Sequence, residues 1–186
     1  MVVYSKAAAR GIKFEDEDVP LGEWLAAATD DAQAVDPRGL TVKGLLADAL
    51  VKGIKPYENR SNRLLRRYLF VHKGKSATPD RWRHVINRHM KKIGDPLPTG
   101  TIVGVMRIDE YLNANDVGGA DAEWVAGPVV HKVGAFLQLD VPVAHKGQLG
   151  EWRLSDEALA SIRAQLGAVL PAPLVRAAQL GLRARK

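Results

Sequence analysis

The sequence of 186 residues contains no cysteine, and this absence excludes several kinds of chemistry. Without thiols the chain forms no disulfide, offers no thiolate to a metal ion and has no cysteine nucleophile. Its five histidines are scattered and show neither the HExxH pattern nor another zinc-binding spacing. We therefore expect no metal site and no cofactor.

Long apolar runs are also missing. No run of about 18 or more apolar residues occurs, and the first residues lack the apolar core of a signal peptide. We therefore expect a soluble, cytoplasmic protein with no membrane partner. The length suffices for one substantial core and is too short for two full-sized domains, so one domain with appendages is expected.

Charge is present, and it is distributed unevenly. The net charge is +6, and residues 52–92 carry 13 Lys and Arg against 2 Asp and Glu. Residues 1–40 carry 4 Lys and Arg against 8 Asp and Glu, and residues 93–152 carry 3 basic residues against 8 acidic ones. Such a concentration indicates a polyanionic partner. The alternative is a solvated basic face that folding spreads around the molecule.

The apolar pattern predicts a main domain over about residues 40–155. It predicts strands at 40–42, 68–71, 101–108, 131–141 and 149–154, a short helix over 45–50 that Gly53 ends, and a helix that Thr78 caps and that continues to about residue 93. In the second helix Trp82, Val85 and Ile86 form an apolar stripe beside a strongly basic face. Short strands separated by turns suggest a barrel.

Segments at both ends lie outside this main domain. Residues 1–39 read as an acidic appendage of helical composition, and residues 156–186 as a basic helical extension whose first helix Ser155 caps. A second helix is expected at 174–182. The acidic run Glu15–Asp18 has the charge to fold over a basic surface as a mimic of nucleic acid, in which case deleting residues 1–38 would tighten nucleic-acid binding.

The segment LLADALVKGIKPYENR, residues 45–60, resembles the helix and loop that open ASCH domains, whose signature is GxKxxExR. Gly53, Lys55, Glu58 and Arg60 occupy its four fixed positions. Three further blocks follow in the family's order: YLFVHKGK at 68–75, TGTIVGVMRIDEY at 99–111 and GAFLQLDVPVAHKGQLGEWRL at 134–154. The resemblance covers about residues 40–155 and leaves the two ends unexplained.

This resemblance implies an α+β fold, a PUA-like small β-barrel of five or six strands with flanking helices. It also implies a cleft beside the opening helix, lined by the signature residues. ASCH domains are associated with binding RNA or other nucleic acid, and relatives in the same fold group read modified bases. We therefore expect recognition of RNA or of a modified base in this cleft, beside a flanking basic surface, with nucleic acid as the partner, RNA favoured and DNA possible.

The signature residues have chemistry suited to such a ligand. Lys55 is a compact cation for a phosphate or a base carbonyl, and burial would let it act as a general base. Glu58 can accept hydrogen bonds from a base edge or position Lys55 and Arg60, and we favour positioning. Arg60 offers a planar fork suited to phosphate. Because Pro56 favours an extended loop over a helix here, the sequence leaves the Lys55–Glu58 distance open.

Further candidates come from the neighbouring segments. Three arginines that follow the signature are placed to extend a positive track, and two aromatic residues outside regular apolar patterns are candidates for base stacking. Trp82, Phe136 and Trp152 lie in regular patterns and are expected in the core. The candidate nucleic-acid-binding residues are Lys55, Tyr57, Glu58, Arg60, Arg63, Arg66, Arg67, His72, Lys73, Trp124 and Lys146.

Two alternatives to a binding module stay open at this stage, and with them the question of catalysis. The first is a hydrolase acting on a modified nucleoside or on RNA, with Lys55 and Glu58 as an acid–base pair and His72 as an assistant. Certain small ASCH proteins hydrolyse acylated cytidine nucleosides, and a ribonuclease activity has been attributed to others. Glu58 stands where the nucleoside hydrolases carry Thr, which argues against that activity. The second is a scaffold whose termini dock protein partners that the sequence does not identify.

Overall fold

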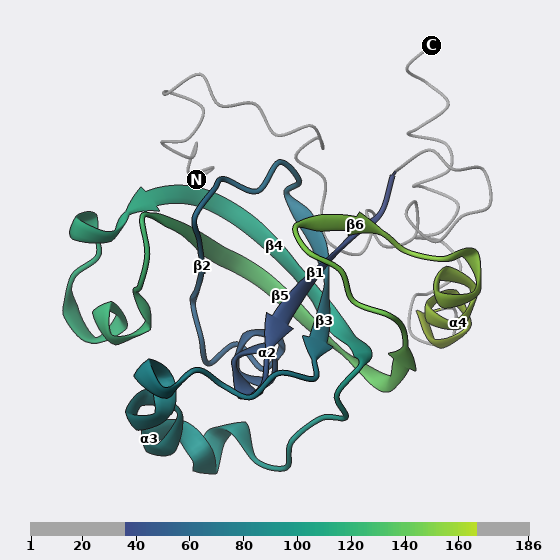
Figure 1. The fold of residues 1–186 in the computed structure, drawn as a ribbon, viewed down its shortest axis with the longest axis horizontal. Coiled ribbons are helices and arrows are strands. Elements are labelled where there is room, and N and C mark those ends of the chain that lie inside the picture. Colours follow the sequence, from purple (N-terminus) through teal and green to yellow (C-terminus); the bar gives the residue numbers. More distant parts are fainter. Residues whose placement is uncertain (1–35, 167–186) are drawn as a thin grey trace, which may run out of the picture.

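The structure, a computed structural model, describes residues 36–166. The helix expected at 174–182, the acidic run Glu15–Asp18 and most of the N-terminal appendage lie outside the described residues. Figure 1 shows the described part as one curled sheet with helices on both of its sides.

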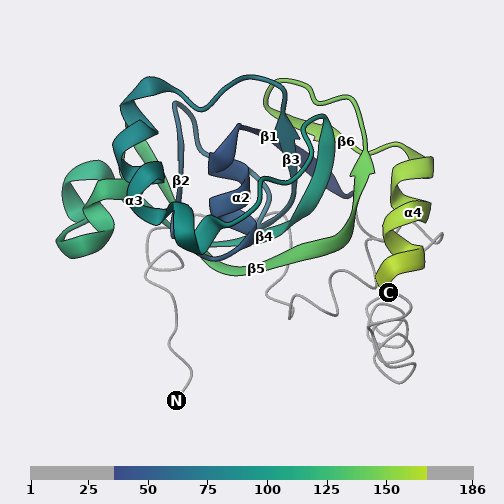
Figure 2. The same ribbon diagram turned by 90° about the horizontal axis from the view of Figure 1, so that it is seen from below.

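A single six-stranded sheet organises the fold. Its order is β2-β5-β4-β3-β1-β6; β1 pairs with β3 in parallel, and every other pair in this sheet is antiparallel. Long, curving β4 and β5 pass beneath α2 in Figure 2, so that the sheet forms half of a barrel. The strands are β1 (Arg38–Lys43), β2 (Tyr57–Arg60), β3 (Tyr68–Gly74), β4 (Thr101–Asn113), β5 (Val129–Ala144) and β6 (Glu151–Arg153). The predicted α+β class with a barrel-like sheet is confirmed.

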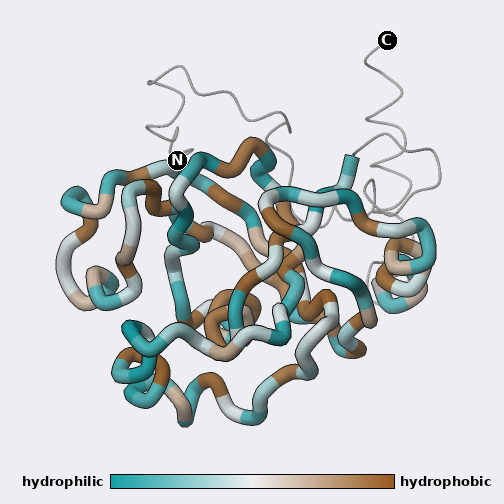
Figure 3. The backbone as a smooth tube through the Cα atoms, viewed as in Figure 1, coloured by the Kyte–Doolittle hydropathy of each residue, from teal (hydrophilic) through white to brown (hydrophobic). Residues whose placement is uncertain are grey.

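Helices cover both faces of the sheet. Helix α2 (Leu45–Val51) lies within the curl and packs with α3 (Arg83–Ile93) in one apolar cluster, whereas α4 (Asp156–Leu166) belongs to a second cluster with Trp152. In Figure 3 the hydrophobic colour gathers on α2 and the neighbouring strands. Every residue of β3 is buried, because its alternating side chains enter both clusters. This double burial explains the continuous apolar run at 68–71.

Most of the predicted elements are confirmed, and four of the strands, β1, β3, β4 and β5, are longer than expected. The chain after Pro56 is extended as expected, but it forms strand β2 and pairs with β5. Ser155 caps α4, since its Oγ accepts the N–H of Ala158 at 3.3 Å. Gly53 follows α2 with φ +68°, and a Cβ there would also overlap the Phe136 ring. The expectation of a core position for Phe136 is wrong, because this side chain lies on the outside of the fold and is 47% exposed.

The capping role predicted for Thr78 is also wrong. Its Oγ1 accepts the N–H of Leu45, the first residue of α2, at 2.9 Å, instead of capping the helix that follows it. Gly44 precedes α2 and has no side chain with which to cap it, so a residue 33 positions along the chain supplies the acceptor. The chain after Thr78 makes a 3₁₀ turn, η2 (Asp80–Trp82), before α3 begins.

Candidate functional site

A cleft of about 160 Å³ opens to solvent between β1, β2, α2 and the turn η2. Three of the four signature residues line it, in the position beside the opening helix where the family resemblance places a cleft. The lining residues are Thr41, Val42, Lys43, Leu46, Lys55, Glu58, Asn59, Arg60, Pro79, Arg81 and Trp82. Residues far apart in the sequence therefore meet here.

Glu58 lies at the centre of a buried charge network. One carboxylate oxygen, Oε2, lies 2.8 Å from Lys55 Nζ, and the other, Oε1, accepts from Arg60 Nε at 2.8 Å. Lys55 Nζ also donates to the carbonyl of Tyr57, and Arg60 Nη2 donates to the carbonyl of Thr41 at 2.9 Å. Arg60 thus ties β2 to β1, which do not pair in the sheet. Glu58 holds the two cations in place, the role that we favoured for it.

The end of α2 brings Lys55 to this position. The carbonyl of Ala49 accepts the N–H groups of both Ile54 and Lys55, at 2.8 and 2.9 Å, and so turns the chain back from the helix. Pro56 then leads into the extended β2, which carries Glu58. This turn and strand place residues 55 and 58 in contact without a helix between them.

Burial and neighbouring charges shift the pKa values of this network. Burial lowers the pKa of Lys55, although Glu58 opposes that effect. Burial alone would raise the pKa of Glu58, but the charges of Lys55 and Arg60 outweigh it and hold that pKa below its usual value. A carboxylate that is held ionised and contacted through both oxygens is a weak proton acceptor. The arrangement therefore suits the positioning of cations better than acid–base chemistry.

His131 of β5 supports the network from behind and was not among the predicted site residues. Its Nδ1 donates to the carbonyl of Glu58 at 3.0 Å, and its Nε2 accepts the N–H of Leu64 at 3.0 Å. Because Nε2 accepts a hydrogen bond, the ring is neutral with its proton on Nδ1. Burial lowers its pKa to about 4. No local pattern in the sequence distinguishes this histidine from the other four.

His131 is expected to make the fold sensitive to acid. Its folded pKa of about 4 lies below the unfolded value of about 6.5, so the unfolded chain binds more protons between these values and stability falls as the pH falls. Between about pH 7 and about pH 4 the loss is about 3 kcal/mol. Urea denaturation across this range measures it, with His131→Asn as the comparison. An equal loss in the variant would show that other groups cause the acid sensitivity.

Asn59 is a second residue that sequence reasoning missed. Its Nδ2 donates to the carbonyl of Trp124 at 2.9 Å, and its Oδ1 accepts the N–H of Ala126 at 2.8 Å. It fastens the segment after the turn η4 (Gly119–Trp124) to β2. Position 59 is variable in the GxKxxExR signature, so the signature gave no signal for this role.

The two aromatic residues expected to stack on bases lie in the core, and this expectation is corrected. Trp124 is 2% exposed, with its ring stacked on Trp82 at 6.2 Å between centroids and near His89 at 5.2 Å. Tyr57 is 8% exposed and belongs to the same apolar cluster. The loop that contains Trp124 folds against α3, which removes the ring from solvent.

His72 and Lys73 do not reach the cleft. They are neighbours on β3, so their side chains point to opposite faces of a strand that is buried on both. His72 faces away from α2, where its Nε2 donates to the carbonyl of His145 at 3.0 Å. Lys73 faces α2, where its Nζ lies 2.6 Å from Asp48 Oδ2. The expectation that these two residues bind nucleic acid, and that His72 assists catalysis, is corrected.

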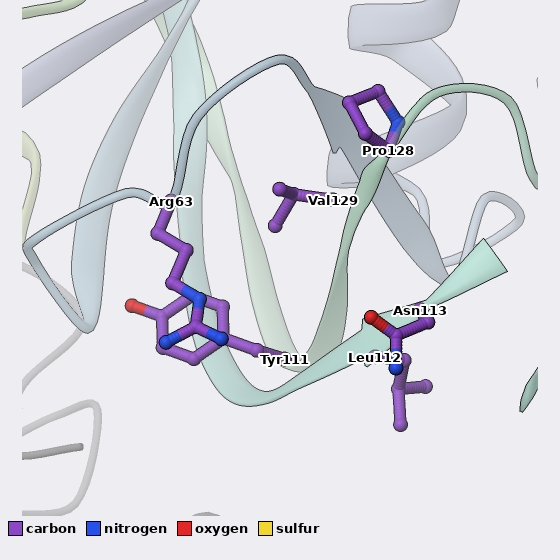
Figure 4. Close-up of a pocket in the computed structure, with 6 residues that line it drawn as sticks. All are labelled: Arg63, Tyr111, Leu112, Asn113, Pro128 and Val129. Atoms are coloured by element: carbon purple, nitrogen blue, oxygen red, sulfur yellow. The ribbon is translucent and has the colours of Figure 1, made fainter.

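Arg63 lies beside a different, smaller pocket. Its guanidinium carbon lies 5.5 Å from the centre of the Tyr111 ring, and the pocket of about 40 Å³ also involves Pro128 and Val129 (Figure 4). Burial raises the pKa of Tyr111 to about 12, and its hydroxyl donates to the carbonyl of Leu64. This pocket has room for only a few waters, so Arg63 is separate from the cleft.

The remaining predicted cations are spread over the molecule. Arg66 pairs with Asp36 at 3.5 Å, and Arg67 lies 4.0 Å from Asp109. Lys146 is exposed in the segment between β5 and β6 and does not line the cleft. The expected track of arginines after the signature is therefore divided, because folding brings acidic residues from other segments beside two of its members.

Comparison with protein-family models and with characterised proteins gives no match to this sequence. Within residues 36–166, no helix is long and apolar enough to cross a membrane. The same residues hold no group of three or more His, Asp or Glu side chains arranged for a metal ion.

Proposed function

We propose that this chain binds nucleic acid, with RNA favoured over DNA, through an ASCH domain of the PUA-like kind. The cleft would receive one nucleotide of the ligand. The observation that carries this proposal is the composition of the cleft wall, where Lys55, Glu58 and Arg60 of the signature meet further cations. The curled six-stranded sheet with flanking helices is compatible with such a domain.

The cleft wall is cationic. Lys43, Lys55, Arg60 and Arg81 line it together with a single carboxylate, that of Glu58. The formal charge of the lining is therefore +3, which favours an anionic ligand. Its remaining surface includes apolar residues such as Val42 and Leu46, suited to the uncharged parts of a nucleotide.

The same geometry favours binding over catalysis. Both oxygens of Glu58 are engaged by cations, and His72 lies on the far face of β3. Of the three residues of the hydrolase alternative, Lys55 and Glu58 therefore line the cleft as an ion pair, and His72 does not reach it. No feature of the described residues favours the scaffold alternative. Absence of nucleic-acid binding in the test below would support it.

The test compares reversal of one charge at the cleft with reversal of one elsewhere. Lys43→Glu changes an exposed residue at the cleft, and Lys92→Glu changes an exposed residue of α3 that does not line it. Fluorescence anisotropy of the full chain would be measured against single-stranded RNA, single-stranded DNA and duplex DNA over a salt series. We expect binding that weakens steeply with salt, tightest for RNA, and reduced about tenfold or more by Lys43→Glu.

The variants are chosen so that a loss of binding does not reflect unfolding. Both positions are exposed, whereas Lys55 is 1% exposed and paired, so replacing it would weaken the fold itself. The Lys92→Glu variant is expected to bind RNA with an affinity no more than about threefold lower than that of the parent protein. Absence of binding at low salt would overturn the proposal. Equal losses in the two variants would place binding outside the cleft.

A further inference from the structure

We infer that the cleft recognises a phosphomonoester, at the end of an oligonucleotide or on a free nucleotide, and reads its charge rather than the base. This inference deepens the proposed function and rests on it. Three features of the cleft support this inference. Arg60 has N–H donors that no protein group uses, two further cations, Lys43 and Arg81, line the cleft, and the polar side chains that could recognise a base are already hydrogen-bonded within the protein.

Arg60 retains donors for a ligand. A guanidinium has five N–H groups, and the contacts with Glu58 and with the carbonyl of Thr41 use two of them. The side chain is 27% exposed, so solvent reaches it. Because two contacts fix its orientation, Arg60 offers the remaining N–H groups at little entropic cost, as tight phosphate binding requires.

Lys43 and Arg81 bring two more positive charges to the same cleft from other elements. Lys43 ends β1, and Arg81 lies in η2 with its guanidinium carbon 5.7 Å from the centre of the Trp82 ring. Stacking on a buried indole keeps the Arg81 head beside the cleft. Within residues 36–166 neither cation forms an ion pair, so their charge is available to a ligand.

The groups that could read a base are already engaged. Side-chain amides and carboxylates discriminate bases through hydrogen bonds to base edges. The amide of Asn59 is committed to Trp124 and Ala126, and both oxygens of Glu58 are committed to cations. The cleft therefore combines strong recognition of charge with weak recognition of bases. A phosphomonoester carries a charge of about −1.5 to −2 near neutral pH, which matches a cationic lining better than a diester does.

The experiment uses the full chain and one short RNA with an internal fluorophore, prepared with no terminal phosphate, with a 5′-phosphate or with a 3′-phosphate. We expect one terminal phosphate to tighten binding about tenfold. Competition by AMP, CMP, the corresponding nucleosides and inorganic phosphate tests the reading of bases. The two monophosphates should compete equally, and the nucleosides about tenfold less well or worse.

Arg81→Gln tests whether the cleft is responsible. Arg81 is exposed, so the variant should fold, which a thermal melt checks. It should abolish most of the tenfold gain from the terminal phosphate, measured as the ratio of the affinities of one variant for the phosphorylated and the unphosphorylated RNA, so that a general loss of RNA affinity cancels. Lys92→Gln, which also removes one exposed positive charge, should keep the gain. If monophosphates compete as well as phosphorylated RNA, the ligand is a free nucleotide; if they compete poorly, it is an oligonucleotide end.

Two results would overturn these ideas separately. RNA binding that is indifferent to the terminal phosphate, or a gain that persists in Arg81→Gln, would overturn the phosphomonoester inference and leave nucleic-acid binding in place. Absence of binding by every form of the RNA at low salt would overturn the proposed function itself.

Discussion

Replacing Glu58 with glutamine is expected to lower the free energy of unfolding by about 3 to 5 kcal/mol, the range for removing one partner of a buried ion pair. Glu58 is 5% exposed and balances Lys55 and Arg60 through separate oxygens. The variant would leave the Lys55 ammonium, 1% exposed, without its compensating charge. Urea denaturation at about pH 7 measures the effect.

The pH dependence of this variant separates loss of charge from loss of packing. Burial already lowers the pKa of Lys55, and removing Glu58 removes the main effect that opposes burial. The folded variant then binds fewer protons than the unfolded chain over a wider range below about pH 10.4, so its stability rises with pH in that range. The deficit relative to the parent protein should therefore shrink between about pH 7 and about pH 9.5. A constant deficit would indicate a packing defect instead.

A double variant supplies the matched control. Lys55→Met combined with Glu58→Gln removes both charges and keeps most of the apolar stem of Lys55 in place. Replacing a buried pair by neutral groups costs much less than breaking it. We expect the double variant to be more stable than Glu58→Gln alone, and a simple sum of the two single losses would contradict a coupled pair.

The sequence predicted the sheet well because local patterns encode it. Strand β3 enters two apolar clusters and therefore appears as a continuous apolar run. Gly53 marks the end of α2 through its positive φ. The GxKxxExR spacing also singled out three residues that the structure brings to one cleft. In each case the information lies within a few consecutive residues.

The rest of the cleft depends on contacts between distant segments, which no local pattern encodes. Lys43 and Arg81 reach the cleft because β1 and the turn η2 lie on two of its sides. Thr78 caps α2 instead of the helix that follows it. His131 joins the network only because β5 pairs with β2. The sequence alone does not show which of these distant segments lie side by side in the fold.

Charge in the sequence was a poor guide to charge on the surface. Residues 52–92 contain 13 cations, but folding buries two of them, Lys55 and Lys73, each beside a carboxylate. Partners from other segments also pair with members of this basic stretch, as Glu123 does with Arg88. The cations that line the cleft form a small positive site. We therefore expect the anionic ligand to bind at this cleft and not along a row of surface arginines.

Lys73→Met is expected to lower the free energy of unfolding by about 3 to 5 kcal/mol, because it removes one partner of a buried ion pair. Lys73 Nζ lies 2.6 Å from Asp48 Oδ2 and donates to the carbonyl of Leu97 at 2.7 Å, and Asp48 Oδ1 accepts the N–H of Leu97 at 2.6 Å. The pair therefore also fixes the backbone of the segment that leads into β4. Denaturation measures the loss of stability, and hydrogen exchange at the Leu97 amide should accelerate.

The same variant tests whether Lys73 acts through folding or through ligand contact. Lys73 is 2% exposed on the inner face of β3, so the folded variant should bind RNA with unchanged affinity at a temperature well below its melting point. Lys75→Met, which removes an exposed cation two residues along, should change stability by no more than about 0.5 kcal/mol. Adding Asp48→Asn to Lys73→Met should recover part of the loss, since the carboxylate is then no longer buried without its partner. A stable Lys73→Met protein with weakened RNA binding would instead return Lys73 to the binding site and contradict its role in the core.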